Sequence, residues 1–170
     1  MVDMSDDVHL DLLRLALIEA NRCEPTPTAF CVGCWQALIL SSGYSRELRG
    51  NTHAEANALA KLRALTPAEF SKQLASFDTT SEMTVDELLR QADVYTTMEP
   101  CSVRTSGLAP CADALITAGI RRCFIGVGEP DDFVQCEGAR KLKDAGIEVI
   151  WLRGMEDECL AAARRGHDVK

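Results

Sequence analysis

Strand-like and helix-like stretches alternate through the second half of this 170-residue chain, and this alternation constrains the fold more than any other feature. Three segments rich in strand-favouring residues each precede a helical pattern. In chain order the six segments are 94–98, 110–118, 123–127, 134–145, 147–152 and 156–165. Strands separated by helices of this length are typical of a parallel sheet with helices on both faces. We therefore expect an α/β fold.

The first half of the chain adds a helix, a hairpin and a second helix to this pattern. Residues 8–22 carry apolar side chains at helical spacing, and the apolar stretch 29–40 with its Ser-Ser-Gly turn predicts a β-hairpin. The Ala- and Leu-rich segment 53–64 predicts the next helix, and two capping-box sequences within 66–92 predict two short helices in an insertion. The prediction is one domain over residues 1–170: three α/β/α layers around a mixed, mostly parallel five-stranded sheet.

Composition excludes several classes of partner. The formal net charge is -8, which disfavours a nucleic acid partner, because such binding depends on neutralising phosphates. No apolar stretch approaches the roughly 20 residues that span a bilayer, so no membrane partner is expected. Eight cysteines follow an acidic start without an apolar run, which favours reduced thiols and a cytoplasmic location.

Four residues in three short motifs point to metal chemistry. His53, Cys101 and Cys111 give one imidazole and two thiols, and a tetrahedral catalytic zinc takes three protein ligands and keeps one position for water. Glu55 is then free to move protons. Zinc lowers the pKa of water to about 7, so this set of residues suits hydrolysis. The order of the four residues resembles the signature of zinc deaminases, which implies attack on a ring carbon that bears an amino group. We predict Zn²⁺ as the cofactor and Glu55 as the catalytic residue.

The spacing of these residues predicts that two helices begin at the site. His53 and Glu55 cannot share a face inside a regular helix, but both can face one site in its first turn, where the Ala54 amide can point at substrate. Cys101 follows a predicted strand, and Cys111 opens a predicted helix, whose N-terminus favours a thiolate. The site is therefore expected at the carboxyl edge of the sheet.

Other interpretations of these residues are weaker. A structural zinc site usually closes with four protein ligands, and no fourth His or Cys stands at a short spacing beside Cys101 or Cys111. A buried histidine beside two buried thiols without metal is the remaining alternative. The Cys31 and Cys34 pair resembles a redox motif but falls in a predicted strand, so we expect core thiols. His9 and His167, near the termini, are expected to face solvent.

The motifs also resemble a known family. Segments 50–55, 96–102 and 109–120 resemble the cytidine-deaminase superfamily, and more narrowly its riboflavin-pathway pyrimidine deaminases, over about residues 28–152. Nine residues separate Cys101 from Cys111, and this long segment looks like the fungal branch, the DRAP deaminases of Rib2 type.

The resemblance implies a substrate, a set of contacts and an assembly. The implied substrate is 2,5-diamino-6-ribitylamino-4(3H)-pyrimidinone 5'-phosphate, a phosphorylated small molecule, and a homodimer is implied as well. Ser102 and Arg104 in the inter-cysteine segment would bind the ribityl phosphate. Asn51 or Thr28 would replace a ring-binding Asn of the bacterial enzymes, because Ala29 and Phe30 stand where those enzymes have Asn-Pro.

Two other functions stay open. Deaminases of cytidine or deoxycytidylate are the alternative among enzymes, although they keep a Cys-x-x-Cys spacing that this chain lacks. RNA editing is disfavoured by the acidic charge. An inactive deaminase-fold binding module is the alternative from another class, and the intact Glu55 argues against it.

Overall fold

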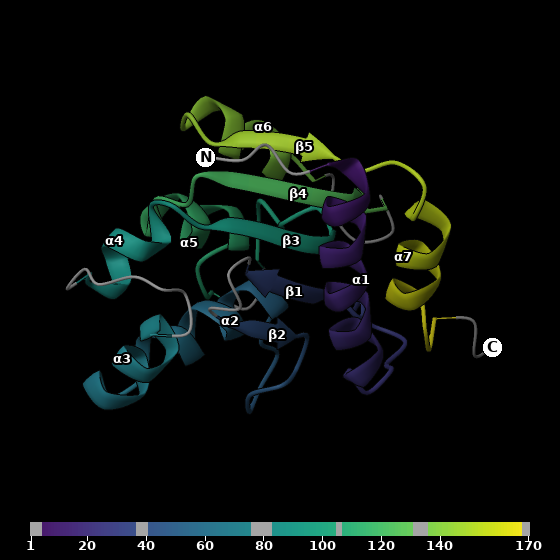
Figure 1. Cartoon of the computed structure of the whole chain (residues 1–170). Helices are drawn as coiled ribbons and strands as arrows, with labels where there is room; N and C mark the ends of the chain where they lie inside the picture. Colours follow the sequence, from purple (N-terminus) through teal and green to yellow (C-terminus); the bar gives the residue numbers. More distant parts are fainter. Residues whose placement is uncertain (1–4, 37–40, 76–82, 105–106, 131–135, 168–170) are drawn as a thin grey trace.

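A five-stranded sheet forms the centre of the molecule (Figure 1). The structure, a computed structural model, describes residues 5–36, 41–75, 83–104, 107–130 and 136–167. Within them the strand order is β2-β1-β3-β4-β5. β1 is antiparallel to both of its neighbours, and β3, β4 and β5 are parallel. The strands are β1 (Gly33–Gln36), β2 (Ser42–Tyr44), β3 (Asp93–Met98), β4 (Arg122–Val127) and β5 (Glu148–Trp151).

Helices cover both faces of this sheet, which confirms the predicted three-layer α/β/α fold. One face packs against α1 (Asp6–Arg22) and α7 (Glu156–Ala163), and α1 crosses the front of the sheet in Figure 1. The other face packs against α2 (Ala54–Arg63), α5 (Cys111–Ala118) and α6 (Gly138–Asp144). Among the described helices, none is both long and apolar enough to cross a membrane.

Two short helices occupy the segment 66–92, as their capping sequences predict. α3 (Pro67–Ala75) begins after Thr66, and α4 (Val85–Leu89) begins after Thr84. The Thr84 hydroxyl accepts a hydrogen bond from the Glu87 amide at 3.2 Å, while the Glu87 carboxylate accepts one from the Thr84 amide at 2.8 Å. These reciprocal bonds satisfy amides that the first turn leaves free. The apolar side chains of both helices join the core beneath α2 and α5.

Several predicted boundaries differ from the structure. The predicted hairpin strand 29–40 is reduced to β1, and residues 37–40 lie outside the described part of the chain. The predicted helix 134–145 begins only at Gly138, while residues 134 and 135 are likewise outside the described part. A Cβ at Gly138 would lie 1.7 Å from the Pro100 carbonyl oxygen, so only glycine permits this contact. Tertiary packing, which local periodicity does not contain, therefore sets where α6 begins.

The expectation that the terminal histidines face solvent is wrong. His9 is buried, with its Nδ1 2.7 Å from the Tyr95 hydroxyl and its ring stacked on Phe124 at 4.3 Å. His167 is half-buried and stacks on Phe30 at 4.9 Å. α1, which carries His9, and α7, which precedes His167, both pack on the sheet. Closeness to a terminus therefore does not mean exposure for these two histidines. Cys31 and Cys34 are core thiols as predicted, each fully buried.

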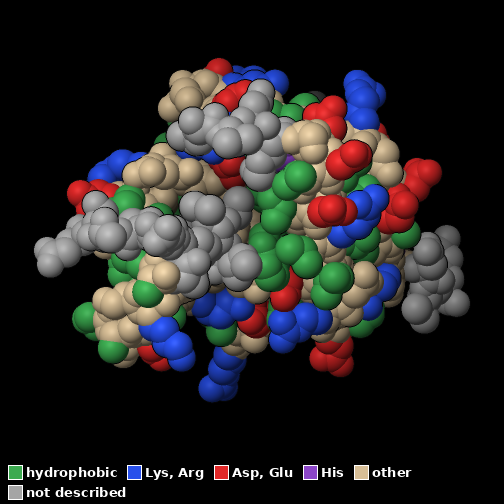
Figure 2. Space-filling view, in the orientation of Figure 1, with side chains coloured by type: hydrophobic (Ala, Val, Ile, Leu, Met, Phe, Trp, Pro, Cys, Tyr) green, Lys and Arg blue, Asp and Glu red, His purple; other side chains and the backbone are tan. Residues whose placement is uncertain are grey.

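The molecular surface carries charges of both signs. Acidic and basic side chains are interspersed on the face shown in Figure 2, with apolar side chains among them. Some of the exposed apolar side chains belong to α1, where Ile18 is 59% exposed and Val8 is 40% exposed. α1 therefore presents two apolar side chains to solvent.

Candidate active site

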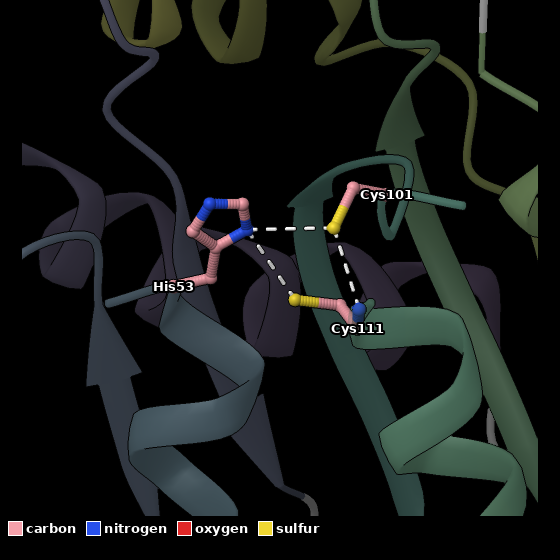
Figure 3. Close-up of side chains that lie close together, drawn as sticks. All are labelled: His53, Cys101 and Cys111. Carbon is pink, nitrogen blue, oxygen red and sulfur yellow. Dashed lines mark hydrogen bonds between the residues drawn. The ribbon is translucent and has the colours of Figure 1, made fainter. Parts of the chain in front are cut away.

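His53, Cys101 and Cys111 meet at the carboxyl edge of the parallel strands, as Figure 3 shows. The Nδ1 atom of His53 lies 3.5 Å from the sulfur of Cys101 and 3.5 Å from the sulfur of Cys111. The Cys111 amide donates a hydrogen bond to the Cys101 sulfur at 3.3 Å. The three donor atoms all lie within 4.8 Å of one another. The structure therefore brings together the three residues that the sequence predicts as ligands.

Each ligand lies where a helix begins or a strand ends. His53 is the N-cap of α2 and has extended backbone angles, while Cys111 is the first residue of α5. Cys101 follows the end of β3 and is tied to α5, because its carbonyl accepts a hydrogen bond from the Ala112 amide at 3.1 Å. The free amides of both helix starts face the same edge of the sheet, where they favour thiolates.

The turn before His53 is held by a buried amide side chain. The Nδ2 of Asn57 donates hydrogen bonds to the Tyr44 carbonyl at 2.8 Å and to the Thr52 hydroxyl at 3.0 Å. The Arg46 amide donates to the Thr52 carbonyl at 2.7 Å. These bonds join β2 to the residue next to His53. They fix the direction in which His53 enters α2.

The donor set fits zinc. Thiolates and imidazole are ligands that Zn²⁺ prefers, and three of them leave the fourth tetrahedral position open. No fourth His, Cys, Asp or Glu joins this group among the described residues. Hydrogen bonds from the Cys111 thiol and from His53 outweigh burial and lower the pKa of Cys101 to about 4. One thiol of the pair is therefore ionised at neutral pH, as a metal ligand must be.

Glu55 lies beside the ligands with its carboxylate inside the protein. The residue is 3% exposed, and its Oε1 accepts a hydrogen bond from the Thr96 hydroxyl at 3.4 Å. Burial raises the pKa of Glu55 above its usual range. A buried carboxylate with a raised pKa holds a proton more readily than an exposed one, as a group that takes up and releases protons must. The geometry therefore agrees with the predicted proton-transfer role.

A cavity of about 330 Å³ opens next to these residues. Of the predicted substrate-binding residues, Thr28, Asn51 and Arg104 line it, together with His53 and Glu55. The guanidinium of Arg104 donates a hydrogen bond to the Asn51 carbonyl, so the inter-cysteine segment is joined to the turn before His53. The cavity thus connects His53 and Cys101 with the cationic side chain of Arg104.

Two predicted substrate-binding residues, Ala54 and Ser102, are not among the described residues that line the cavity. Ala54 is fully buried as the first residue of α2. The Ser102 hydroxyl accepts a hydrogen bond from the Glu137 amide at 3.1 Å, next to the start of α6. The side chain of Ser102 therefore holds the inter-cysteine segment against α6.

Sequence reasoning did not identify three charged residues of the cavity wall, which are Arg46, Glu99 and Glu129. Glu129 follows β4 at the carboxyl edge of the sheet, and burial raises the pKa of its carboxyl. Its place at the end of a parallel strand was the signal that could have found it. No comparable signal marks Arg46, which lies in a turn between β2 and α2.

The fold and the three-ligand site define a zinc-binding deaminase domain. Residues 6–127 match the family described as the cytidine and deoxycytidylate deaminase zinc-binding region, and the chain belongs to this family. Zinc is accordingly the cofactor, and His53, Cys101 and Cys111 form a possible site for it.

Relatives from fungi are similar over nearly the whole chain. The diaminohydroxyphosphoribosylamino-pyrimidine deaminase of Schizosaccharomyces pombe is 41% identical over 165 residues, which cover 95% of this chain and 36% of that protein. The crystal structure of Aspergillus oryzae Rib2 deaminase in complex with DARIPP, a C-terminal deletion mutant, matches with a TM-score of 0.75 and 33% identity. This match covers 96% of this chain and 93% of the Aspergillus chain.

Bacterial relatives share the same fold. Acinetobacter baumannii RibD matches with a TM-score of 0.69 and 24% identity, covering 93% of this chain and 38% of that chain. The chain spans about a third of the length of the curated relatives that it matches first. In the match with the Aspergillus structure, both chains correspond over nearly their full length.

Proposed function

We propose that this protein is a hydrolytic, zinc-dependent deaminase of 2,5-diamino-6-ribitylamino-4(3H)-pyrimidinone 5'-phosphate in riboflavin biosynthesis. The products are ammonia and 5-amino-6-ribitylamino-2,4(1H,3H)-pyrimidinedione 5'-phosphate. The observation that carries this proposal is the match, at 33% identity, to Aspergillus oryzae Rib2 deaminase in complex with DARIPP over 96% of this chain. The 41% identity to the pyrimidine deaminase of Schizosaccharomyces pombe supports it.

The chemistry follows from His53, Cys101, Cys111 and Glu55. His53, Cys101 and Cys111 would hold zinc, which supplies a Lewis acid that lowers the pKa of water to about 7. Glu55 takes a proton from the attacking water and passes it to the ring nitrogen. It then takes the remaining proton from the hydroxyl of the tetrahedral carbon and gives it to the departing amine. The bond between the ring carbon and the exocyclic nitrogen breaks, a carbonyl forms, and one water is consumed for each ammonia released.

Residues of the cavity wall would bind the rest of the substrate. We assign the ribityl phosphate to Arg104, because its guanidinium lines the cavity on the inter-cysteine segment. Thr28 and Asn51, which also line the cavity, offer a hydroxyl and an amide for the ring or the ribityl chain. The Ala54 amide, in the first turn of α2 between His53 and Glu55, would face the ring.

We further infer that the chain acts as one domain, as a homodimer and in the cytoplasm. The single sheet, whose core extends from α1 to α7, supports one domain over residues 1–170, with 66–92 as a helical insertion. The homodimer follows from the family resemblance. The cytoplasm suits the zinc site because Cys101 and Cys111 must stay reduced to bind a metal.

The test is ammonia release by the zinc-loaded protein, measured separately with the pyrimidinone phosphate, cytidine and deoxycytidylate. Ammonia from the pyrimidinone phosphate alone is the expected result. Ammonia only from cytidine or deoxycytidylate would keep the mechanism and reject the pathway. Absence of ammonia from all three would contradict the proposal and favour the inactive binding module.

A further inference from the structure

One wall of the cavity is a loop with few regular hydrogen bonds. Thr28, Ala29 and Phe30 line the cavity from the segment between α1 and β1. This segment contains two prolines, and its backbone pairing within the loop is one isolated bridge between Thr26 and Ala29. Such a segment needs contacts from outside to keep one conformation, since each unrestrained residue gains conformational entropy.

Arg46 supplies these contacts with its side chain. One guanidinium nitrogen, Nη1, donates a hydrogen bond to the Phe30 carbonyl at 3.2 Å. The other, Nη2, donates to the Glu24 carbonyl at 2.7 Å and lies 2.8 Å from the Cys23 sulfur. The guanidinium therefore ties both ends of the loop to one point.

The charge of Arg46 also has a buried counterpart in the loop. The sulfur of Cys31 lies 3.4 Å from Nη2, and both Cys31 and Cys23 are buried. A hydrogen bond from Cys23 and the positive charges of Arg46 and Arg165 outweigh burial and lower the pKa of Cys31 to about 6. Charge-assisted hydrogen bonds of this kind are about twice as strong as neutral ones.

The backbone of Arg46 connects the loop to the metal site. Its amide donates to the carbonyl of Thr52, the residue before His53. Its φ angle is 62°, in the left-handed region that favours glycine. Any residue except proline can donate this backbone bond, whereas only a long, forked side chain reaches Phe30 and Glu24. An arginine therefore occupies a backbone conformation that favours glycine, and its side chain bonds the Phe30 and Glu24 carbonyls.

We propose that Arg46 is a positioning residue that holds the loop wall of the cavity at a fixed distance from His53 and so sets the affinity for substrate. The inference rests on the proposed deaminase function. Loss of the guanidinium lets Thr28 and Phe30 move away from the cavity, while the three metal ligands and Glu55 keep their own contacts. The effect falls on substrate binding, with little change in the chemical step.

Arg165 provides a matched control in the same region. Its Nη2 donates hydrogen bonds to the Ala20 and Cys23 carbonyls, both at 2.8 Å. It thus ties the start of the same segment, but it is not among the described residues that line the cavity. If loosening of the segment alone raised KM, substitution of either arginine would raise it equally. If Arg46 positions the cavity wall, only substitution of Arg46 raises KM.

The experiment compares Arg46→Gly, Arg46→Lys and Arg165→Ala with the wild type. Glycine removes the guanidinium and also relieves the backbone strain at φ 62°. The relief of strain offsets part of the stability that is lost with the side chain. The readouts are KM and kcat for the pyrimidinone phosphate, zinc content, and hydrogen exchange of the segment 28–31 without substrate. The Cys31 amide, which donates to the Ala163 carbonyl at 2.9 Å, reports on this segment.

We expect Arg46→Gly to raise KM about tenfold, with kcat and zinc content changed less than about twofold, and segment 28–31 to exchange faster. Arg46→Lys should fall between it and the wild type, and Arg165→Ala should lower stability while KM stays near the wild-type value. A wild-type KM in Arg46→Gly, or an equal rise of KM in Arg165→Ala, would overturn the proposal. If the wild type releases no ammonia, the proposed deaminase function is wrong. Unchanged hydrogen exchange of segment 28–31 in Arg46→Gly would overturn the Arg46 inference independently of that function.

Discussion

The two halves of the cavity are built differently. The metal half consists of His53, Glu55 and Cys101, together with Cys111. The loop half consists of Thr28, Phe30, Arg46, Asn51 and Arg104. The metal half comes from short motifs at two helix starts and one strand end. The loop half comes from turns that are distant in sequence and joined by side-chain hydrogen bonds. In the proposed function, the first half supplies the reaction and the second supplies the choice of substrate. Substitutions in the two halves should therefore have different kinetic effects.

The largest effect is expected for Cys101→Ala in the metal half. Loss of this thiolate should weaken zinc binding by more than about 100-fold, since removing even an outer hydrogen-bond partner of a metal ligand costs about 10–100-fold. Activity should be lost with the metal. Zinc content by mass spectrometry and ammonia release check this. Cys136→Ala is the matched control, because Cys136 donates to the Pro100 carbonyl beside the site without being a ligand candidate. A Cys101→Ala protein that retains stoichiometric zinc would contradict the ligand assignment.

A smaller effect is expected for Arg104→Ala in the loop half. The variant removes the proposed phosphate contact and the bond to the Asn51 carbonyl, so KM should rise about tenfold while zinc content stays at the wild-type level. Steady-state kinetics with the pyrimidinone phosphate measure it. Arg140→Ala removes an exposed arginine that pairs with Glu137 outside the cavity, and it should leave KM unchanged. An unchanged KM in Arg104→Ala would remove Arg104 from the binding site.

The smallest effect on activity is expected at the opposite end of β3, where Asp93 accepts hydrogen bonds from Arg121 and Arg122. Burial alone would raise the pKa of Asp93, but the bonds from the two arginines outweigh it and hold this pKa below its usual range. Since the folded-state pKa is lower than the unfolded one, the stabilisation is present above the unfolded value of about 3.9 and is lost as pH falls through the folded value.

Asp93→Asn should therefore lower the free energy of unfolding by about 2 kcal/mol at pH 7, the usual contribution of hydrogen bonds to a charged group, with KM and zinc content unchanged. The difference in stability between the two proteins should shrink progressively as pH falls below about 4. Urea unfolding of both proteins across this pH range measures it. A difference that stays constant down to the lowest pH would show that the Asp93 carboxylate contributes nothing through its charge.

Prediction from the sequence succeeded where the pattern is local. The alternation of strands and helices predicted the sheet, and a motif recognisable over a few positions predicted that His53, Cys101 and Cys111 lie together. The role of Glu55 stays a prediction. Prediction from the sequence failed where a contact joins distant segments. His9 is buried through Tyr95 and Phe124, and Gly138 begins α6 because Pro100 lies against it.

The loop half of the cavity shows the same limit. Arg104, Asn51 and Thr28 were named through the family resemblance, and all three line the cavity. Arg46 and Glu129 were missed. Nothing local distinguishes Arg46 from a solvated arginine, since its role depends on carbonyls and thiols about twenty residues earlier in the chain. Such roles become visible only when the three-dimensional structure is known.

The central claim is that Glu55 moves protons beside a zinc site that it does not help to hold. The most direct measurement is zinc content and ammonia release on the same sample of Glu55→Gln and of the wild type. The account predicts equal zinc in both proteins and a loss of turnover of at least about 100-fold in the variant, because proton transfer contributes about 10²–10⁴-fold to such reactions. Turnover near the wild-type rate with zinc bound, or loss of zinc together with activity, would contradict it.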